Sequence, residues 1–190
     1  MDIVNKDELF TKKRYLTKRL KESIFIYPTD TIYGIGCNAE NKELVNKLRL
    51  LKKRFGMPFS IIVPSLKWIE TNCDITPEAE KWMEKLPGPY TLVMNLTDKK
   101  AVASNVNLDG KTIGVRIPDN WFSKIVSDME VPIVTTSANM AGQNVLSSIE
   151  DLDPMLKKGV EFFIDDGEIQ GKASTLVMLD KPKTDVIKRD

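Results

Sequence analysis

Two stretches of the chain place apolar residues at helical spacing. Leucines recur through residues 5–21 between lysines and arginines, which predicts an amphipathic helix whose charges face water. A second helix is predicted over residues 41–54, because leucines recur at i, i+4 and i+7 after Asn41, a suitable N-cap residue. The glycine and proline that follow are expected to end this helix, which puts Lys52 and Arg54 in its last turn.

Short apolar, β-prone runs predict the strands of a sheet. The expected strands cover residues 23–27, 59–63, 91–96, 112–117, 132–136, 160–164, 174–179 and 185–189. Further helices are expected over 77–86, 119–129 and 147–158, the last opening with the capping-box pattern Ser147-x-x-Glu150. Strands and helices intermix without a linker or a repeat. The pattern therefore predicts an α/β fold in a single domain over residues 1–190, with a twisted, mixed sheet and flanking helices.

Composition narrows the class of protein. Among 190 residues, 42% are hydrophobic and 29% are charged, which is typical of globular proteins. The net charge of +1 means that any attraction for nucleic acid must come from a local patch. Two cysteines without CxxC spacing argue against a disulfide framework and fit a reducing cytoplasm. The charged N-terminus and the lack of a long apolar run predict a protein that is neither exported nor membrane-spanning.

The chain contains no histidine. Catalytic mechanisms that use a Ser-His or Cys-His pair, a histidine-bound metal or a histidine acid/base are therefore excluded. The remaining groups are cationic clamps, hydroxyl and amide hydrogen bonds, carboxylates, and a metal held by the phosphates of a substrate. This set of groups favours phosphoryl or nucleotidyl transfer.

Four polar segments are candidates for that chemistry, and they cover residues 28–36, 52–54, 112–116 and 135–139. Each also has a purely structural interpretation. Residues 28–36 would form a capped turn, and the cations at 52–54 would complement a helix dipole. Residues 112–116 would end a strand in solvent, and residues 135–139 would cap the next turn. The first segment imitates a dinucleotide fingerprint weakly, because its polar loop separates the strand from the glycines. No P-loop motif is present.

The residue types in these segments suit a phosphorylated ligand. Lys52 offers a point charge and Arg54 a bidentate fork, and together they can neutralise a polyphosphate. Thr112, Gly114 and Arg116 share one face of their strand, and the glycine permits close approach to the backbone. The small polar residues 135–139 follow an apolar strand and suit hydrogen bonding to a ligand.

Six segments, taken in order, resemble successive motifs of the YrdC-type synthase family. They are YPTDTIYGIGCNA, KKRFGMPFSIIV, LPGPYTLVM, TIGVRIPDN, PIVTTSANMAG and KASTLVM, and they span residues 27–178. The pairing of a KxR motif with an SAN motif is the most specific part of this resemblance. It implies a YrdC-like α/β fold around a positively charged groove, and activity as an L-threonylcarbamoyladenylate synthase.

The resemblance also assigns residues to the two larger substrates. The ATP contacts would be Lys52, Arg54, Thr112, Ser137, Asn139 and Arg189, with Lys52 and Arg54 in the catalytic role. The L-threonine contacts would be Thr29, Thr31, Arg116, Thr135 and Ser174. Two positions depart from the family pattern, since Phe55 replaces the proline after KxR and Asp190 replaces a proline–glycine after the terminal arginine.

The synthase that this family implies joins ATP, L-threonine and bicarbonate and passes its product to a transferase that acts on tRNA. Mg2+ would enter with the ATP phosphates, without a ligand from a protein side chain. RNA contact through the basic groove is also expected. The chain ends where longer relatives continue, so we expect the short, single-domain form of the family. The alternative is a noncatalytic RNA-binding protein of the same fold, which would use the groove and the basic N-terminal helix.

Overall fold

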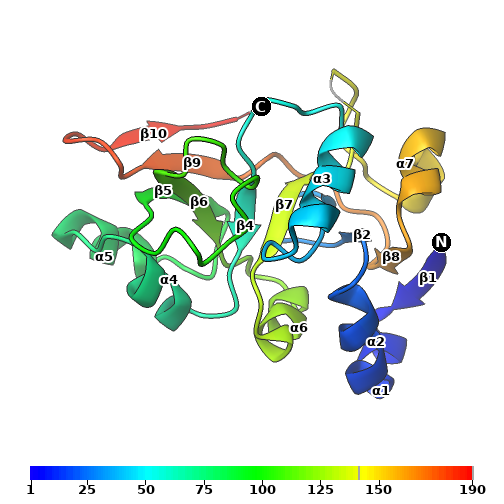
Figure 1. Cartoon of the computed structure of the whole chain (residues 1–190). Helices are drawn as coiled ribbons and strands as arrows, with labels where there is room; N and C mark the ends of the chain where they lie inside the picture. The colour runs from blue at the N-terminus through cyan, green and yellow to red at the C-terminus, as the bar shows by residue number, and fades with distance from the viewer. Residues whose placement is uncertain (141, 190) are drawn as a thin grey trace.

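The computed structural model describes residues 1–140 and 142–189, and ten strands in it form one twisted, mixed sheet (Figure 1). Their order across the sheet is β1-β8-β2-β3-β7-β4-β6-β5-β9-β10. The strands are β1 (Asp2–Asn5), β2 (Phe25–Tyr27), β3 (Gly34–Gly36), β4 (Ser60–Ile62), β5 (Tyr90–Asn95), β6 (Thr112–Arg116), β7 (Ile133–Ser137), β8 (Phe162–Asp165), β9 (Thr175–Met178) and β10 (Asp185–Ile187). Parallel and antiparallel neighbours both occur, which confirms the predicted mixed sheet.

Helices flank the sheet on both sides and bury two separate hydrophobic clusters. The helices are α1 (Lys6–Thr11), α2 (Lys13–Leu20), α3 (Lys42–Leu51), α4 (Leu66–Asn72), α5 (Pro77–Met83), α6 (Phe122–Met129) and α7 (Pro154–Gly159). Residues of α1, α2 and α6 form the smaller cluster with one face of the sheet. Residues of α3, α4, α5 and α7 form the larger cluster on the other face. The predicted α/β class with flanking helices is confirmed.

The predicted helix starts follow capping chemistry. The Asn41 side chain accepts hydrogen bonds from the backbone N–H groups of Glu43 and Leu44, both at 3.1 Å, and caps α3 as predicted. Helix α5 begins at Pro77, also as predicted, because proline at the first helical position loses no intrahelical hydrogen bond.

The predicted helices have different bounds in the structure. Helix α5 ends three residues earlier than the predicted 77–86, and α6 begins three residues later than the predicted 119–129. The helix predicted over residues 5–21 is divided at Lys12, whose φ of −102° and ψ of 24° turn α2 away from α1. The helix predicted over 41–54 ends at Leu51, because Lys53 adopts the left-handed conformation with a φ of 50°. Lys52 is therefore the C-cap residue, and the placement of Arg54 in the last helical turn was wrong.

The helix predicted over residues 147–158 was also wrong. The segment forms a 3-10 turn (Ile149–Asp151) and then α7, whose N-cap is Asp153. The proline at the start of α7 has no N–H and disfavours helical geometry in the residue before it, so one continuous helix cannot form. The Ser147 hydroxyl donates a hydrogen bond to the Asp151 carboxylate, at 2.7 Å, and the predicted capping box is not formed.

Some short elements of the structure have no clear signal in the sequence. Strands β1 and β3 and helix α4 were not predicted, since each is short and lacks a clear periodic pattern. Cys37 and Cys73 are free and buried, as expected for a chain without a disulfide framework. Among the residues that the structure describes, no helix is long and apolar enough to cross a membrane. Ala141 and Asp190, which belong to two of the motif arguments, lie outside the described residues.

Register explains why one part of the sheet surface is polar. Ile62 of β4 pairs with Ile133 of β7, and both pack in the cluster beneath α6. Two residues earlier along β4, Ser60 pairs with Thr135 on one side and with Gly114 on the other. Alternation puts these three residues on the same face as the isoleucines. The face therefore changes from an apolar surface to a row of small, polar side chains.

We predict that Gly36→Ala destabilises the fold. A Cβ atom at Gly36 would lie 1.8 Å from the carbonyl oxygen of Val134, so β3 and β7 would have to separate. The expected loss in the free energy of unfolding is about 3 kcal/mol. Gly56→Ala is the matched control, because a Cβ there meets no atom within 4 Å and its change should stay within about 0.5 kcal/mol. Urea unfolding of both variants tests this, and equal midpoints would contradict it.

Candidate functional site

A cavity of about 130 Å³ opens over the polar row of the sheet, and four distant parts of the chain form its walls. They are the turn after β2, the segment after α3, the end of β7, and the last residues before β9 together with the C-terminal segment. The lining residues are Thr29, Ile32, Tyr33, Gly34, Arg54, Ser60, Thr91, Arg116, Thr135, Thr136, Ser137, Ala173, Ser174 and Arg189. The cavity is therefore rich in hydroxyl groups and arginines.

Most of the residues predicted for the site meet in this cavity. Those that line it are Thr29, Arg54, Arg116, Thr135, Ser137, Ser174 and Arg189. Those that do not line it are Thr31, Lys52, Thr112 and Asn139. Thr31 and Lys52 are nevertheless buried beside it, and Asn139 faces a neighbouring open groove. Thr112 accepts hydrogen bonds from Asn107 instead, and its predicted contact with a nucleotide stays a prediction.

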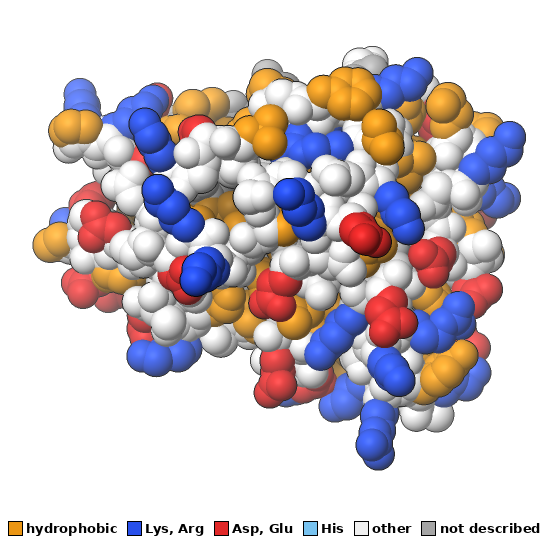
Figure 2. Space-filling view, in the orientation of Figure 1, with side chains coloured by type: hydrophobic (Ala, Val, Ile, Leu, Met, Phe, Trp, Pro, Cys, Tyr) orange, Lys and Arg blue, Asp and Glu red, His pale blue; other side chains and the backbone are white. Residues whose placement is uncertain are grey.

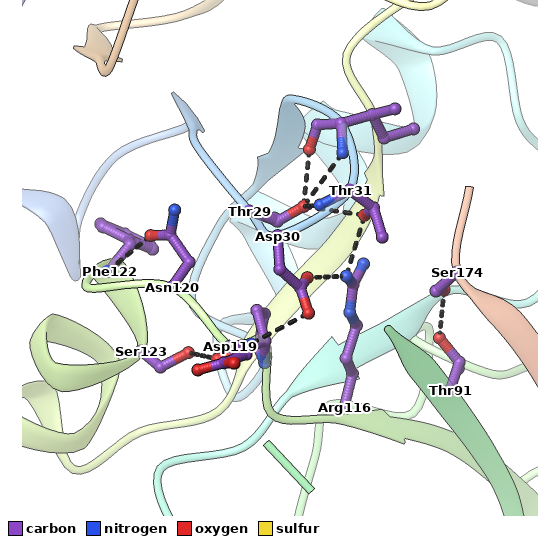
Figure 3. Close-up of polar contacts among 12 residues, drawn as sticks. Thr29, Asp30, Thr31, Thr91, Arg116, Asp119, Asn120, Phe122, Ser123 and Ser174 are labelled. Carbon is purple, nitrogen blue, oxygen red and sulfur yellow. Dashed lines mark hydrogen bonds and ion pairs between the residues drawn. The ribbon is translucent and has the colours of Figure 1, made fainter. Parts of the chain in front are cut away.

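The turn after β2 is held together by a threonine hydroxyl (Figure 3). Thr29 Oγ1 accepts hydrogen bonds from the backbone N–H groups of Thr31, at 3.1 Å, and Ile32, at 3.2 Å. The hydroxyls of Thr29 and Thr31 also lie 2.9 Å apart. Such side-chain bonds replace the backbone partners that a tight turn lacks. The turn therefore presents fixed hydroxyls at the carboxyl end of β2.

Arg116 extends from the end of β6 toward this turn (Figure 3). It forms an ion pair with Asp30, and its Nη2 donates a hydrogen bond to Thr31 Oγ1 at 2.8 Å. Its Nε is buried and has no hydrogen-bond partner among the described residues. Burial lowers the pKa of Arg116, whereas the Asp30 carboxylate opposes that shift. A buried guanidinium with an unused N–H is a ready donor for an anionic ligand.

Lys52 anchors the SAN segment in this structure. Its Nζ donates hydrogen bonds to the backbone carbonyls of Ser137, at 2.7 Å, and Asn139. The Ser137 hydroxyl donates to the Asn139 side chain at 2.6 Å, and the Asn139 amide donates to the carbonyl of Gln143 at 2.7 Å. Burial, followed by repulsion from Arg54, lowers the pKa of Lys52 to about 8. The lysine therefore joins the KxR and SAN motifs directly.

Arg54 reaches the same cavity from the other side of the SAN segment. Its Nη1 donates a hydrogen bond to Thr136 Oγ1 at 3.0 Å, and its Nη2 donates to the carbonyl of Pro58 at 2.7 Å. Its Nε is buried and, within the described part of the chain, has no partner. Burial and the nearby Arg49 lower the pKa of Arg54. Both cavity arginines that come from the sequence motifs thus keep an unused donor.

Arg189 folds back from the C-terminal segment and closes one end of the cavity. Its Nε and Nη2 donate to the carbonyl and the hydroxyl of Ser174, both at 2.7 Å. The Ser174 hydroxyl also lies 2.7 Å from Thr91 Oγ1. The pKa of Arg189 is lowered by burial and then by the charges of Arg116 and Arg54. Three arginines therefore share one small space and repel one another.

Sequence reasoning missed several residues of the site. Ser60 and Thr91 are single polar residues in apolar strands, and that interruption was a usable signal. Asp30 was not assigned a role, although it lies between two threonines that were. Gly171 also had no role, yet a Cβ there would lie 2.0 Å from the carbonyl oxygen of Thr31. This close approach brings the segment before β9 against the turn after β2.

The arrangement of cations around the cavity suits binding of a polyanion. Arg54, Arg116 and Arg189 line the cavity, Lys52 is buried beside it, and Asp30 is the carboxylate that pairs with Arg116. Within the described residues, no cluster of His, Cys, Asp and Glu could hold a metal ion. Charge clamps of this kind stabilise phosphate groups during transfer.

A match to a family model identifies the family of this chain. The model named Sua5_yciO_yrdC, described as "Telomere recombination", matches residues 18–189. The chain belongs to the Sua5/YciO/YrdC family. This result confirms the predicted YrdC-type resemblance, and the match includes every motif that suggested it.

Relatives within the Sua5/YciO/YrdC family have both similar sequences and similar folds. A protein of Methanocaldococcus jannaschii, provisionally named threonylcarbamoyl-AMP synthase, is 35% identical over 95% of this chain and 86% of its own. The threonylcarbamoyl-AMP synthase of Vibrio vulnificus is 26% identical over 74% of this chain and 78% of its own. The structure of P. abyssi Sua5 with L-threonine superimposes with a TM-score of 0.82 at 26% identity. The match covers 98% of this chain but 56% of the Sua5 chain.

We predict that anion affinity falls as the pH rises above about 8, the pKa of Lys52. An anion favours the protonated amine, so affinity should be level below that pH and about tenfold weaker well above it. Sulfate is a suitable probe, because its own charge is constant over this range. Calorimetric titration from pH 7 to 10 measures the step, and Lys52→Met should remove it. Lys53→Met, at an exposed neighbour, should retain it. A step that survives in Lys52→Met would contradict the assignment.

Proposed function

We propose that the cavity is the active site of an L-threonylcarbamoyladenylate synthase, which makes threonylcarbamoyl-AMP and pyrophosphate from ATP, L-threonine and bicarbonate. The observation that carries the proposal is the set of cations around one cavity, two of which have a buried Nε without a hydrogen-bond partner among the described residues. Relatives with this enzyme name, and a solved relative that binds L-threonine, support the same reaction.

The two ends of the cavity suit different substrates. Arg116 is the donor for the threonine carboxylate, since its Nε is unused and the hydroxyls of Thr29 and Thr31 lie beside it. Thr135 and Ser174 extend this hydroxyl-lined end. The ATP phosphates take the opposite end, where they meet the cations and amides of the KxR and SAN motifs. These residues are Lys52, Arg54, Ser137 and Asn139. Arg189 donates to Ser174 and would reach the phosphates from the boundary between the two ends.

The reaction needs positioning more than a protein nucleophile. The threonine amine attacks bicarbonate to give a carbamate, and water leaves. A carbamate oxygen then attacks the α-phosphorus of ATP, an O–P bond forms, and the bond to pyrophosphate breaks. Lys52 and Arg54 are the catalytic residues, because they neutralise charge that builds on the phosphates. Holding the reactants together supplies much of the remaining acceleration, and no histidine is required.

We propose that Mg2+ accompanies the ATP. The cavity lining consists of hydroxyls, arginines and apolar groups, so its donor set fits an ion that is held by phosphate oxygens. When bound, the ion would neutralise part of the phosphate charge. The side chains that face the phosphates would then orient them and exclude water.

The steps before and after the reaction belong to the same proposal. Bicarbonate supplies the carbonyl carbon, and a separate transferase takes the labile adenylate to the tRNA adenosine next to the anticodon. RNA contact would use the basic groove and the N-terminal helices. Residues 1–22 contain seven Lys and Arg against four Asp and Glu, and Figure 2 shows these basic side chains over α1 and α2 at the lower right. A cytoplasmic location fits this hand-over to tRNA.

Omitting each substrate in turn tests the function. Purified protein is incubated with ATP, Mg2+, bicarbonate and L-threonine, and pyrophosphate release is measured. We expect release only when all four are present. Release that ignores threonine or bicarbonate would contradict the proposal. No release from folded protein, together with salt-dependent binding of RNA, would instead favour the noncatalytic RNA-binding alternative.

Two arginine variants should separate the ends of the cavity. Arg54→Ala should lower kcat about 100-fold with a small change in the KM for threonine, because it removes stabilisation of phosphate charge. Arg116→Ala should raise the KM for threonine at least about tenfold, because it removes a charged hydrogen-bond donor. Steady-state kinetics with both substrates varied gives these constants, and Lys53→Ala is the exposed control. Indistinguishable kinetic profiles for the two arginine variants would refute the assignment.

A further inference from the structure

Asp30 pairs with Arg116, which lines the cavity. The two side chains form an ion pair in which Arg116 is 6% exposed and Asp30 is 10% exposed. The other oxygen of Asp30 accepts a hydrogen bond from the backbone N–H of Asp119 at 3.0 Å (Figure 3). Arg116 lines the cavity, whereas Asp30 is not among its lining residues. The charge of Arg116 is therefore compensated inside the protein before any ligand binds.

The other cations of the cavity differ in this respect. Arg54 and Arg189 donate hydrogen bonds to neutral hydroxyls and carbonyls, and Lys52 donates to two carbonyls. Across residues 1–140 and 142–189, none of these three cations belongs to an ion pair. Lys52, Arg54 and Arg189 therefore carry charge that no carboxylate of the described residues pairs with, whereas the charge of Arg116 is paired with Asp30.

We propose that Asp30 is a positioning residue that sets the anion selectivity of the cavity. By compensating Arg116, it makes the space around this arginine accept a singly charged carboxylate and reject a phosphate dianion. The phosphates then bind at Arg54 and Arg189, the cations that no carboxylate of the described residues compensates. The inference rests on the proposed function, and it adds the reason why two anionic substrates do not exchange places.

Coulomb's law supports this division. Repulsion by the Asp30 carboxylate is twice as large for a dianion as for a monoanion at the same distance. Arg116 attracts both, but the nearby carboxylate cancels much of that attraction, and hydrogen-bond geometry then decides binding. Arg116 Nη2 already donates to Asp30 and Thr31, so a carboxylate meets the remaining Nε–H and needs a single charged hydrogen bond. The carboxylate therefore loses less than phosphate does from the presence of Asp30.

The turn keeps Asp30 in place. Thr29 Oγ1 accepts two backbone hydrogen bonds on the far side of Asp30, which fixes the direction of the turn. The N–H of Asp119 fixes the carboxylate from the loop after β6. Asp30 is therefore held at both its backbone and its side chain, so its charge stays beside Arg116 when a ligand enters.

Asp30→Asn tests the proposal with little change in volume. Sulfate serves as the phosphate-like probe in isothermal titration calorimetry. We expect the variant to bind sulfate about tenfold more tightly than the unmodified protein, because Arg116 becomes an uncompensated cation. In turnover assays, inorganic phosphate should become competitive with L-threonine in the variant, and it should not compete with L-threonine in the unmodified protein. A purely structural role for Asp30 would not change the competition pattern.

Asp119→Asn is the matched control, because it removes an exposed carboxylate from the same loop without removing the backbone N–H that Asp30 uses. Its sulfate affinity should stay within about twofold of the unmodified protein, since an exposed charge is screened. Unchanged sulfate affinity in Asp30→Asn would overturn the proposal. An equal gain in Asp119→Asn would also overturn it, because the effect would then be one of overall charge.

A second variant covers the case in which Asp30→Asn does not fold. Arg116→Gln leaves the Asp30 carboxylate without its partner, so the cavity as a whole should bind sulfate about tenfold more weakly. Unchanged affinity in a folded Arg116→Gln protein would refute the division of charge. The sulfate measurements need no turnover. A failure of the synthase reaction is therefore distinguishable from a failure of the selectivity proposal.

Discussion

The gathering of like charges in one small cavity is the constraint on which this site depends. Arg54, Arg116 and Arg189 line a space of about 130 Å³, and their mutual repulsion opposes folding. The sheet overcomes that repulsion because it is buried by a hydrophobic cluster on each face. The rigid strands then hold the cations at positions they would not adopt alone. Binding of an anion relieves this repulsion. The same repulsion that destabilises the folded protein therefore favours the binding of an anion.

The polar surface of the sheet begins where helix α6 no longer covers the strands. On β4, the residue under α6 is Ile62, and two residues earlier it is Ser60. The same change occurs on β7, between Ile133 and Thr135. One face of the sheet thus serves first as a core and then as a binding surface. The lack of a side chain at Gly114 leaves room that the side chains of Ser60 and Thr91 occupy, since a Cβ there would lie 2.6 Å from Ser60 Oγ.

Local patterns in the sequence were sufficient to predict most of this framework, but not its exceptions. The caps at Asn41 and Pro77 and the apolar runs of the strands are local signals, and the structure confirms them. The stop at Lys53 was not predictable in the same way, because a left-handed lysine has no marker in the sequence. The short strand Gly34–Gly36 depends on β2 and β7 for its hydrogen bonds rather than on its own propensity.

The residues of the candidate site were likewise predictable only where a local motif marks them. Residues of the motifs meet at the cavity because each motif ends a strand or a helix beside it. Asp30 and Arg189 show the limit, since their roles depend on contacts with Arg116 and Ser174 across 86 and 15 residues of sequence. A charge at a chain terminus is ordinarily solvated, and only the fold of β9 and β10 returns Arg189 to the cavity. The role of Asp30 follows from tertiary structure alone, whereas the family resemblance already assigned Arg189 to ATP and the structure adds its contact with Ser174.

Lys52 links the binding of a ligand to the shape of the site. Its ammonium group holds the carbonyls of Ser137 and Asn139, and it is also the cation that the KxR motif offers to a phosphate. One ammonium has three N–H donors, so two carbonyls leave one donor for a ligand. A phosphate that takes this donor is attached through Lys52 to the SAN segment. The KxR and SAN motifs are therefore joined into one unit by Lys52.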